Sequence, residues 1–232
     1  MKVNTDGVLL GAAVTLYEQD RNILDAGTGT GTIALMMAQR LSGMALDWHD
    51  VRIAGIDIDE ASAGEALMNF NLSPWSSALS ARHTSLKDFM PSERLDLIVS
   101  NPPFFDDSLL PPLERRSMAR HTVGPALSFY SLVDYSREHL RPDGRLAVIL
   151  PSDQELRTVR YAVSCGLYPF RILRIRTTPK KSVARVVMEF CMKQSDSIKE
   201  ELLTIQDPAS FPENRNGYTP EYLALTGDFY LK

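Results

Sequence analysis

A glycine-rich turn between a buried strand and a helix is the feature that most constrains this sequence. Residues 23–26 (Ile-Leu-Asp-Ala) form an apolar run of strand type, and residues 32–41 have the composition of a helix. Between them, Gly27, Gly29 and Gly31 alternate with threonines. Alternate glycines permit positive φ angles and a close approach of the backbone to a ligand. The helix that follows offers free N–H groups and the positive end of its dipole, so the turn predicts a ligand site.

Strand and helix patterns alternate along most of the chain. Further strands are expected near residues 51–59, 78–88, 94–100, 145–150, 171–176 and 183–190, and further helices near residues 60–71, 125–140, 152–165 and 219–226. The last two strands follow each other without a helix, which indicates an antiparallel pair. We therefore expect an α/β, Rossmann-like fold: a seven-stranded, mostly parallel sheet with an antiparallel C-terminal hairpin and helices on both faces. Residues 141–144 predict a turn, and the polar tail from Lys193 predicts irregular structure before the last helix.

Composition excludes several classes of protein. The 232 residues suit one large α/β domain, and a formal net charge of -4 argues against sequence-independent nucleic-acid binding through a strongly basic surface. No run of the sequence approaches the ~18 apolar residues of a membrane-spanning helix. Cys165 and Cys191 stand in apolar surroundings without metal-type spacing. We therefore expect buried free thiols, no metal site and a cytoplasmic location.

A second motif follows another predicted strand. Residues 95–99 (Leu-Asp-Leu-Ile-Val) form the strand, and one residue later come Asn101, Pro102, Pro103 and Phe104. The prolines fix their own φ angles and lack N–H donors, so the strand ends there. In open α/β sheets, ligands bind at the carboxyl ends of the strands. The motif therefore presents an amide side chain and an aromatic ring at the end of the sheet that carries the glycine turn.

The glycine turn is compatible with two cofactors or with none. A dinucleotide site has the spacing G-x-G-x-x-G, whereas the glycines here are spaced G-x-G-x-G. Asp25 would repel a pyrophosphate but attract the ammonium group of an amino acid, which favours S-adenosylmethionine. Asp57 ends the second strand, where an acidic residue commonly binds ribose hydroxyls, and Asp59 is expected to cap the next helix. A tight turn without a ligand is the third interpretation.

The motifs resemble those of the class I methyltransferases. They are residues 25–31 (Asp-Ala-Gly-Thr-Gly-Thr-Gly), 55–59 (Gly-Ile-Asp-Ile-Asp) and 101–104 (Asn-Pro-Pro-Phe). The last is similar to the N-P-P-[FY] signature of enzymes that methylate a planar-bonded nitrogen. The whole chain resembles the bacterial tRNA adenine-N6 methyltransferases, which act on the adenine beside the anticodon of a valine tRNA. That resemblance rests on residues 1–11, 71–75, 119–121 and 218–222. In that family a short segment usually precedes the Lys-Val-x-Thr-Asp stretch.

The resemblance implies a methyl transfer from S-adenosylmethionine to N6 of an adenine in the anticodon stem-loop of tRNA. It implies a monomer with one methyltransferase domain over residues 1–232, in which residues 1–20 cover the cofactor and residues 193–232 form an extension. The expected catalytic residues are Asn101, Pro102 and Phe104. The expected cofactor-binding residues are Thr5, Asp25, Gly27, Gly29, Gly31, Asp57, Asp88 and Asn101.

Physical chemistry supports these roles. The lone pair of the adenine amino group is delocalised into the ring. Hydrogen bonds accepted from that group by the side chain of Asn101 and the carbonyl of Pro102 would make it more available. Stacking on Phe104 is worth ~1–3 kcal/mol in nucleic-acid sites. Alignment of the reacting atoms contributes ~7–11 kcal/mol, and a base in a loop is cheaper to splay out than a base in a duplex.

Several alternatives are compatible with the sequence. Relatives of the motif serve methylation of rRNA guanine, DNA adenine or a protein glutamine. An RNA-binding module without catalysis is a further alternative, and a nicotinamide oxidoreductase is another, although it leaves the Asn-Pro-Pro-Phe motif unexplained. Asp88 is expected either to bind the amino group of the cofactor's adenine or to cap a helix or turn, and His121 to contact RNA, to lie in the core or to have no role. The basic residues between Arg171 and Arg185 form either a phosphate-facing patch or a solvated hairpin.

Overall fold

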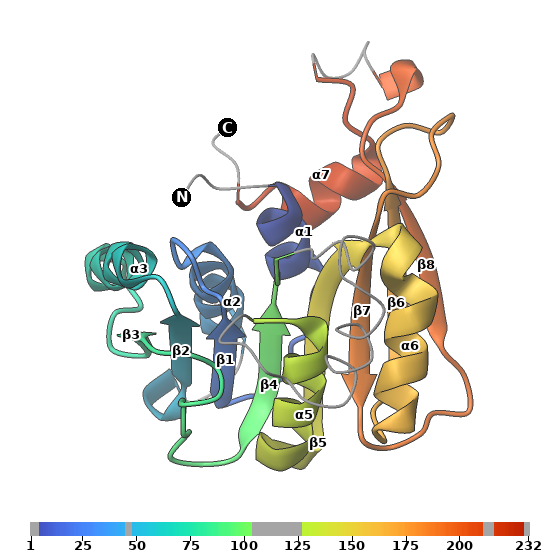
Figure 1. Ribbon diagram of the computed structural model, residues 1–232. Coiled ribbons are helices and arrows are strands. Elements are labelled where there is room, and N and C mark those ends of the chain that lie inside the picture. The colour runs from blue at the N-terminus through green and yellow to red at the C-terminus, as the bar shows by residue number, and fades with distance from the viewer. Residues whose placement is uncertain (1–4, 45–47, 104–126, 211–215, 230–232) are drawn as a thin grey trace.

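A sheet with the strand order β3-β2-β1-β4-β5-β7-β6-β8 forms the centre of the molecule (Figure 1). The computed structural model describes residues 5–44, 48–103, 127–210 and 216–229. The strands are β1 Asn22–Ala26, β2 Arg52–Asp57, β3 Leu79–His83, β4 Leu95–Ser100, β5 Leu140–Pro151, β6 Tyr168–Arg176, β7 Arg185–Cys191 and β8 Lys199–Thr204. All run parallel except β7, which is antiparallel to β5 and β6. The predicted architecture is confirmed, with eight strands in the described residues instead of seven.

The additional strand, β8, lies in the tail for which the sequence predicts irregular structure. Its side chains explain the error, because only Leu203 is buried. Glu201 accepts from Arg171 of β6 at 2.6 Å, and Glu200 accepts from Arg174 of β6 at 2.7 Å. An edge strand held by charge pairs to its neighbour lacks the apolar alternation that marks a strand in a sequence.

β5 begins earlier than the sequence predicts. Residues 141–144, expected as a turn, belong to the strand. The pairing of β5 with β4 shifts register, from Leu95 opposite Leu140 to Leu97 opposite Arg145. The extra residues bulge out of the ladder, and the proline among them, which has no N–H to donate, suits such a position.

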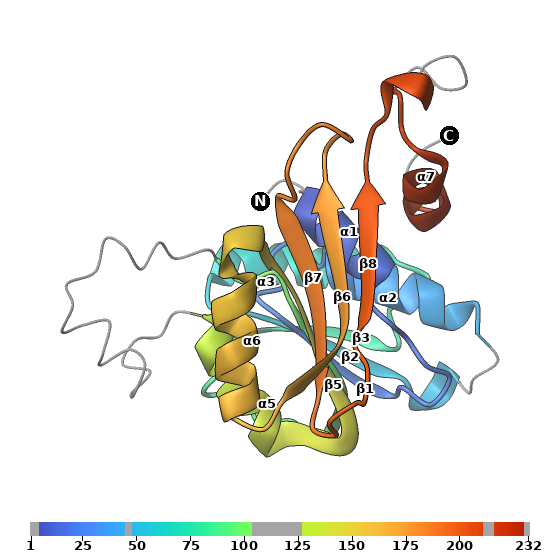
Figure 2. The ribbon, with the colours of Figure 1, turned by 90° about the vertical axis from the view of Figure 1, so that its right-hand side faces the viewer.

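Helices cover both faces of the sheet (Figure 2). They are α1 Thr5–Ala13, α2 Thr32–Ser42, α3 Glu60–Leu72, α5 Phe129–His139, α6 Glu155–Ser164 and α7 Pro220–Thr226, with short 3₁₀ helices at Trp48–Asp50, Ser152–Gln154 and Pro208–Ser210. One hydrophobic cluster joins α1, α2, α3 and α7 to one face and includes the fully buried Leu10, Met37 and Phe70. A second cluster joins α5 and α6 to the other face through Leu132 and Ala162.

Two arginines hold the end of α1 in place. The last carbonyl groups of an α-helix have no partner inside the helix. Arg40 of α2 donates to the carbonyls of Gly11 and Val14, both at 2.8 Å, and Arg171 of β6 donates to the carbonyl of Ala13 at 2.6 Å. Cations at a helix C-terminus also interact favourably with the helix dipole. The position of α1 therefore depends on residues far away in the sequence.

Gly31 generates a prediction about stability. It precedes α2 with a φ of 81°, and a Cβ atom there would lie 2.4 Å from Cε1 of Phe70. We expect Gly31→Ala to lower the free energy of unfolding by about 2–4 kcal/mol, because the variant suffers both backbone strain and a clash with a buried ring. Urea denaturation measures the change.

Gly64 is the matched control. It lies inside α3, and a Cβ atom there would meet nothing within 4 Å. Gly64→Ala should raise the free energy of unfolding by about 0.5–1 kcal/mol, because alanine favours a helix over glycine. Equal effects of the two substitutions would contradict this account of Gly31.

Candidate active site

The candidate site lies where β1 and β4 end side by side. These strands pair in parallel with Asp25 opposite Val99, while β2 pairs with the other edge of β1. The direction in which the chain adds strands therefore reverses between β1 and β4, and such a switch point forms a crevice at the carboxyl ends of the strands. β1 leads into the glycine turn and β4 into the Asn-Pro-Pro motif, so the fold brings both predicted motifs to one crevice.

A buried hydrogen bond fixes the relation between the two motifs. The hydroxyl of Ser100 donates to the carbonyl of Ala26 at 2.7 Å, and both residues are fully buried. The chain continues from Ala26 into the glycine turn and from Ser100 into half-buried Asn101 and buried Pro102. These two predicted catalytic residues therefore lie beside the glycine turn, whereas Phe104 lies outside the described residues.

The glycine turn has the backbone conformation that the sequence predicts. The φ angle is 73° at Gly27, 56° at Gly29 and 81° at Gly31. The amide of Gly27 donates to the carbonyl of Ile56 in β2 at 2.9 Å. A Cβ atom at Gly27 would lie 2.6 Å from Cδ2 of Leu127. This position therefore requires glycine both for its conformation and for the close approach of the segment that leads into α5.

Asp25 is buried beneath this turn. Its Oδ2 atom accepts from the hydroxyl of Thr28 at 2.7 Å and from the amide of Ala34 at 3.2 Å. Its Oδ1 atom has no hydrogen-bond partner among the described residues. Burial raises the pKa of the Asp25 carboxyl to about 7; the two hydrogen bonds oppose this shift and the charge of Asp57 adds to it. Because an uncompensated buried carboxylate is costly, the position favours a proton or a bound cation.

Asp57 ends β2 beside the turn. Its Oδ2 atom accepts from the amide of Gly29 and its Oδ1 atom from the amide of Asp59, both at 2.9 Å. Each carboxylate oxygen retains a further acceptor site, so the oriented group can also accept from a pair of hydroxyls. Asp59 caps α3 by accepting from the amide of Ser62 at 2.8 Å, which confirms the role predicted for it.

Two predicted cofactor residues lie farther from the turn along the chain. Asp88 is exposed in the turn after β3, and its carboxylate accepts from the hydroxyl of Ser85 at 2.6 Å, as a turn cap does. Thr5 is exposed in the first turn of α1, where Asp6 accepts from Arg185 of β7 at 2.8 Å. In the described parts of the chain, no hydrogen bond joins Asp88 or Thr5 to the glycine turn. Their contribution to a cofactor site stays a prediction.

Three supporting residues were missed by the sequence analysis. Thr28 stands inside the glycine turn and Ser100 directly before the Asn-Pro-Pro-Phe motif, so their closeness to the two motifs is the signal in the sequence that marks them. Asn69 of α3 donates from its side chain to the carbonyl of Thr30 at 2.9 Å and so supports the glycine turn. It is 39 positions from its partner, and nothing local in the sequence marks it.

The basic hairpin is largely compensated by carboxylates. Arg171 donates to the buried Glu189 at 2.7 Å, and Arg174 donates to Glu155 of α6 at 3.0 Å. The hydrogen bonds to Glu155 and Glu200 raise the pKa of Arg174 above its ordinary value. The hairpin is therefore neither an open phosphate patch at these two positions nor simply solvated. His121 lies outside the described residues.

The remaining predictions concern thiols, metals and membranes. Cys165 and Cys191 are free, but they are half-buried and not buried as expected, because both stand at the ends of their elements. Within the described residues, no group of three or more His, Cys, Asp or Glu side chains is arranged to hold a metal ion. In the same part of the chain, every helix is too short or too polar to cross a membrane.

Comparison with known proteins identifies the family. The methyltransferase small domain family matches residues 7–163. The tRNA1(Val) (adenine(37)-N6)-methyltransferase of Flavobacterium johnsoniae is 38% identical over 100% of this chain and 93% of that protein. The protein of the same name from Bacteroides thetaiotaomicron is 38% identical over 100% of this chain and 91% of its own. The chain belongs to the methyltransferase small domain family.

Solved structures agree on the fold of this methyltransferase. A predicted O-methyltransferase from Agrobacterium tumefaciens gives a TM-score of 0.69 at 14% identity, covering 95% of both chains. A glycopeptide N-methyltransferase in complex with S-adenosyl-L-homocysteine gives 0.57 at 11% identity, covering 83% of this chain and 90% of its own. At such identities the likeness concerns the fold alone, which is the class I methyltransferase fold that the sequence predicts.

Asp25 generates a prediction about the pH dependence of stability. Its pKa rises from the ordinary value of 3.8 to about 7 in the folded methyltransferase. Between these values the folded state retains a proton that the unfolded state has lost. The wild-type protein should therefore lose stability relative to Asp25→Asn as the pH rises, by at most about 4 kcal/mol, and no further above about pH 7. Urea denaturation at pH 5, 6, 7 and 8 measures the difference.

Asp88→Asn is the control for this experiment, because Asp88 is an exposed carboxylate in a turn. Its stability relative to the wild type should change little over the same range. A difference between wild type and Asp25→Asn that does not depend on pH would contradict a buried carboxyl with a raised pKa.

Proposed function

We propose that this chain transfers a methyl group from S-adenosylmethionine to N6 of an adenine in tRNA, beside the anticodon of a valine tRNA. The observation that carries the proposal is the junction at the switch point, where Asn101 and Pro102 follow the Ser100–Ala26 hydrogen bond directly beside the glycine turn. The relatives at 38% identity, whose names state this reaction, support the same conclusion.

The residues of the crevice fit the cofactor. The unpartnered Oδ1 atom of buried Asp25 suits the ammonium group of a methionine moiety, which would also keep the carboxyl ionised. Asp57 is oriented to accept from a ribose diol. With two carboxylates beside the glycines, the site suits a cofactor without phosphate groups. S-adenosylmethionine supplies, when bound, a methyl group activated by its sulfonium.

The acceptor side of the reaction uses Asn101 and Pro102. The side-chain oxygen of Asn101 and the carbonyl of Pro102 accept from the two N–H bonds of the adenine amino group and fix its nitrogen toward the cofactor. In the transfer, the amino nitrogen would take the methyl group from the sulfonium, the sulfur would leave as a neutral thioether, and the proton lost from the nitrogen would pass to water. Phe104 is proposed to stack on the base, as the sequence motif implies.

The domain extent, the oligomeric state, the location and the substrate form part of the same proposal. Residues 1–232 would act as one methyltransferase domain and as a monomer in the cytoplasm, without a metal ion. Residues 1–20 would cover the cofactor, which is supported by the position of α1 beside the carboxyl ends of the central strands (Figure 1). Residues 193–232 would form an extension, to which β8 and α7 belong. The substrate would be the anticodon stem-loop.

Asn101→Ala tests the mechanism. We expect the rate of methyl transfer to fall by about 100-fold or more, since the variant loses a positioned hydrogen-bond partner of the reacting group. Cofactor affinity should fall far less than the rate, because Asn101 is one predicted cofactor contact among several and the glycine turn, Asp25 and Asp57 are intact. Transfer of labelled methyl groups to tRNA and calorimetry with S-adenosylmethionine measure the two effects.

The control variant is Asn71→Ala, which removes an exposed amide on α3 outside the crevice and should leave both quantities unchanged. Parallel assays with ribosomal subunits, DNA and release-factor protein separate the alternative substrates. Labelling of one of these in place of tRNA would overturn the substrate assignment. Full activity of Asn101→Ala on tRNA would overturn the mechanism.

A further inference from the structure

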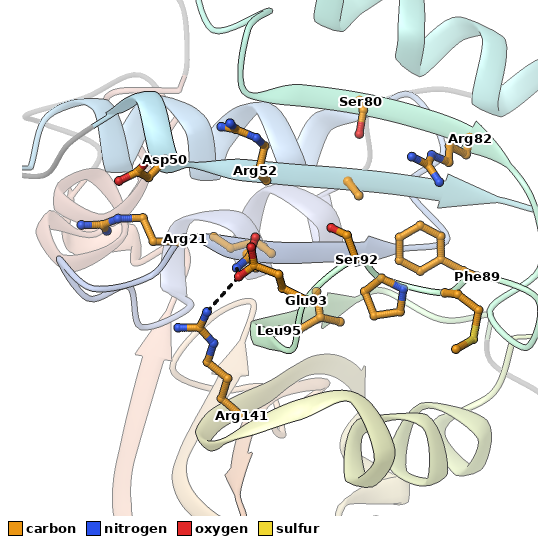
Figure 3. A pocket seen from close by; sticks show the side chains of 15 residues that line it. Arg21, Asp50, Arg52, Ser80, Arg82, Phe89, Ser92, Glu93, Leu95 and Arg141 are labelled. Atoms are coloured by element: carbon orange, nitrogen blue, oxygen red, sulfur yellow. Dashed lines mark hydrogen bonds and ion pairs between the residues drawn. The ribbon is translucent and has the colours of Figure 1, made fainter.

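A second concave site lies on one face of the sheet. It is a groove of about 510 Å³ that runs from the amino ends of β1 and β2 toward the carboxyl end of β3, where Arg82 pairs with Ile56 (Figure 3). Its polar lining comes from β1, β2, β3 and β5 and from the segments that precede β1, β2 and β4. The charged residues of the lining are Arg21, Arg52, Arg82, Arg141, Asp50 and Glu93.

The groove exists because one face of the sheet is open there. Residues 84–94, which connect β3 to β4, contain no helix, and only Leu86 and Phe89 of this connection belong to the hydrophobic core. The helices of this face, α5 and α6, pack against β5 and β6. Side chains on this face of β2 and β3 are therefore reachable from solvent, and both Arg52 and Arg82 are exposed.

Two arginines at one end of the groove are held in the same way. Arg21 donates from Nη1 to the carbonyls of Glu18 and Asp20, at 2.6 and 3.0 Å. Arg52 donates from Nη1 to the carbonyls of His49 and Val51, at 2.6 and 2.8 Å. Each guanidinium is thus oriented through one nitrogen, and within the described residues its other N–H groups make no hydrogen bond. Such planar donors suit phosphate oxygens.

A third arginine stands at the other end of the groove. The guanidinium of Arg82 lies 5.8 Å from the centre of the Phe89 ring, within the range of a cation–π contact. It forms no ion pair among the described residues. Figure 3 shows Arg82 and Phe89 at one end and Arg21 and Asp50 at the other, with Ser80 and Ser92 between. The three arginines are therefore spaced along the groove and do not converge on one point.

The carboxylates of the groove do not cancel this charge. Glu93 accepts from Arg141 at 3.4 Å, and Asp96 contacts the same guanidinium at 3.3 Å. Asp50 is the remaining acidic group in the lining. Together with Arg141, four arginines thus stand against the three carboxylates of Asp50, Glu93 and Asp96, which leaves a positive excess on a chain whose formal net charge is -4. A local positive field on an acidic protein is typical of a site for an anionic partner.

We propose that this groove binds the sugar–phosphate backbone of the RNA substrate, away from the nucleotide that is methylated. The inference rests on the proposed function. A polyanion fits better than a single phosphate group, because the arginines are spaced along an open groove. Residues 22 to 26 of β1 span about 13 Å between the end of the groove at Arg21 and the crevice. One folded RNA can therefore contact both ends of the sheet, and the groove sets its affinity without touching the reacting base.

The variant R21Q/R52Q/R82Q tests the proposal in the full-length protein, with unfractionated tRNA as the probe. We expect RNA affinity to fall tenfold or more at low salt. The slope of log K against log [NaCl] should become shallower by roughly two to three. The KM for tRNA should rise, while kcat at saturating tRNA and the affinity for S-adenosylmethionine stay unchanged.

Matched single variants separate the groove from general surface charge. R52Q removes an exposed arginine inside the groove, and R137Q removes an exposed arginine of α5 outside it. Only R52Q should weaken RNA binding and reduce the salt slope. RNA affinity within twofold of wild type in the triple variant, or equal losses in R52Q and R137Q, would overturn the proposal.

Two further outcomes are decisive. Calorimetry with pyrophosphate tests for a small-anion site. Binding of pyrophosphate that the triple variant abolishes, with RNA affinity unmoved, would mean that the groove serves a small anion and that the proposal is wrong. If the wild-type protein binds tRNA but does not methylate it, the proposed function fails, and the RNA-binding measurements still decide whether the groove holds RNA.

Discussion

Parallel pairing of β1 with β4 is the constraint on which the site depends. The two strands are separated in the sequence by β2 and β3, yet their register places Asp25 opposite Val99 and joins Ser100 to Ala26 through a buried hydrogen bond. A slip of one residue would turn each side chain of a strand to the opposite face of the sheet. The acceptor motif and the glycine turn are therefore related by rigid backbone, as a reaction that depends on alignment requires.

Buried charge specifies the position of the segment that follows α1. Glu189 of β7 is fully buried and accepts from the amide and hydroxyl of Thr15, at 3.0 and 2.9 Å, and from Arg171 at 2.7 Å. Nearby, Arg145 of β5 pairs with buried Asp20 at 2.6 Å. Such pairs add little net stability, because desolvation offsets their attraction, but an unpaired partner would be costly. The network therefore acts mainly by penalising any other position of the segment that follows α1.

The parts of the structure that were predicted from the sequence depend on local chemistry. Glycines that need positive φ angles and prolines that end a strand mark Gly27 and Asn101 without knowledge of the fold. The parts that were missed depend on contacts across the sheet. β8 is held by charge pairs to β6, and Asn69 reaches the glycine turn from α3. The groove on the open face of β2 and β3 reflects a connection without a helix, and a single sequence does not show which face of a strand stays uncovered.

That connection also affects the energetics of the sheet. β2 and β3 pack against α3 on one face, while residues 84–94 supply only a partial layer on the other. We expect β2 and β3, which we call the wing of the sheet, to unfold locally more readily than the central strands and as a separate unit. Asp57 stands at the end of β2, so a ligand held by Asp57 contributes its binding free energy to the closed form of the wing. Binding of the cofactor therefore stabilises β2 and β3, a part of the sheet whose second face the chain covers only in part.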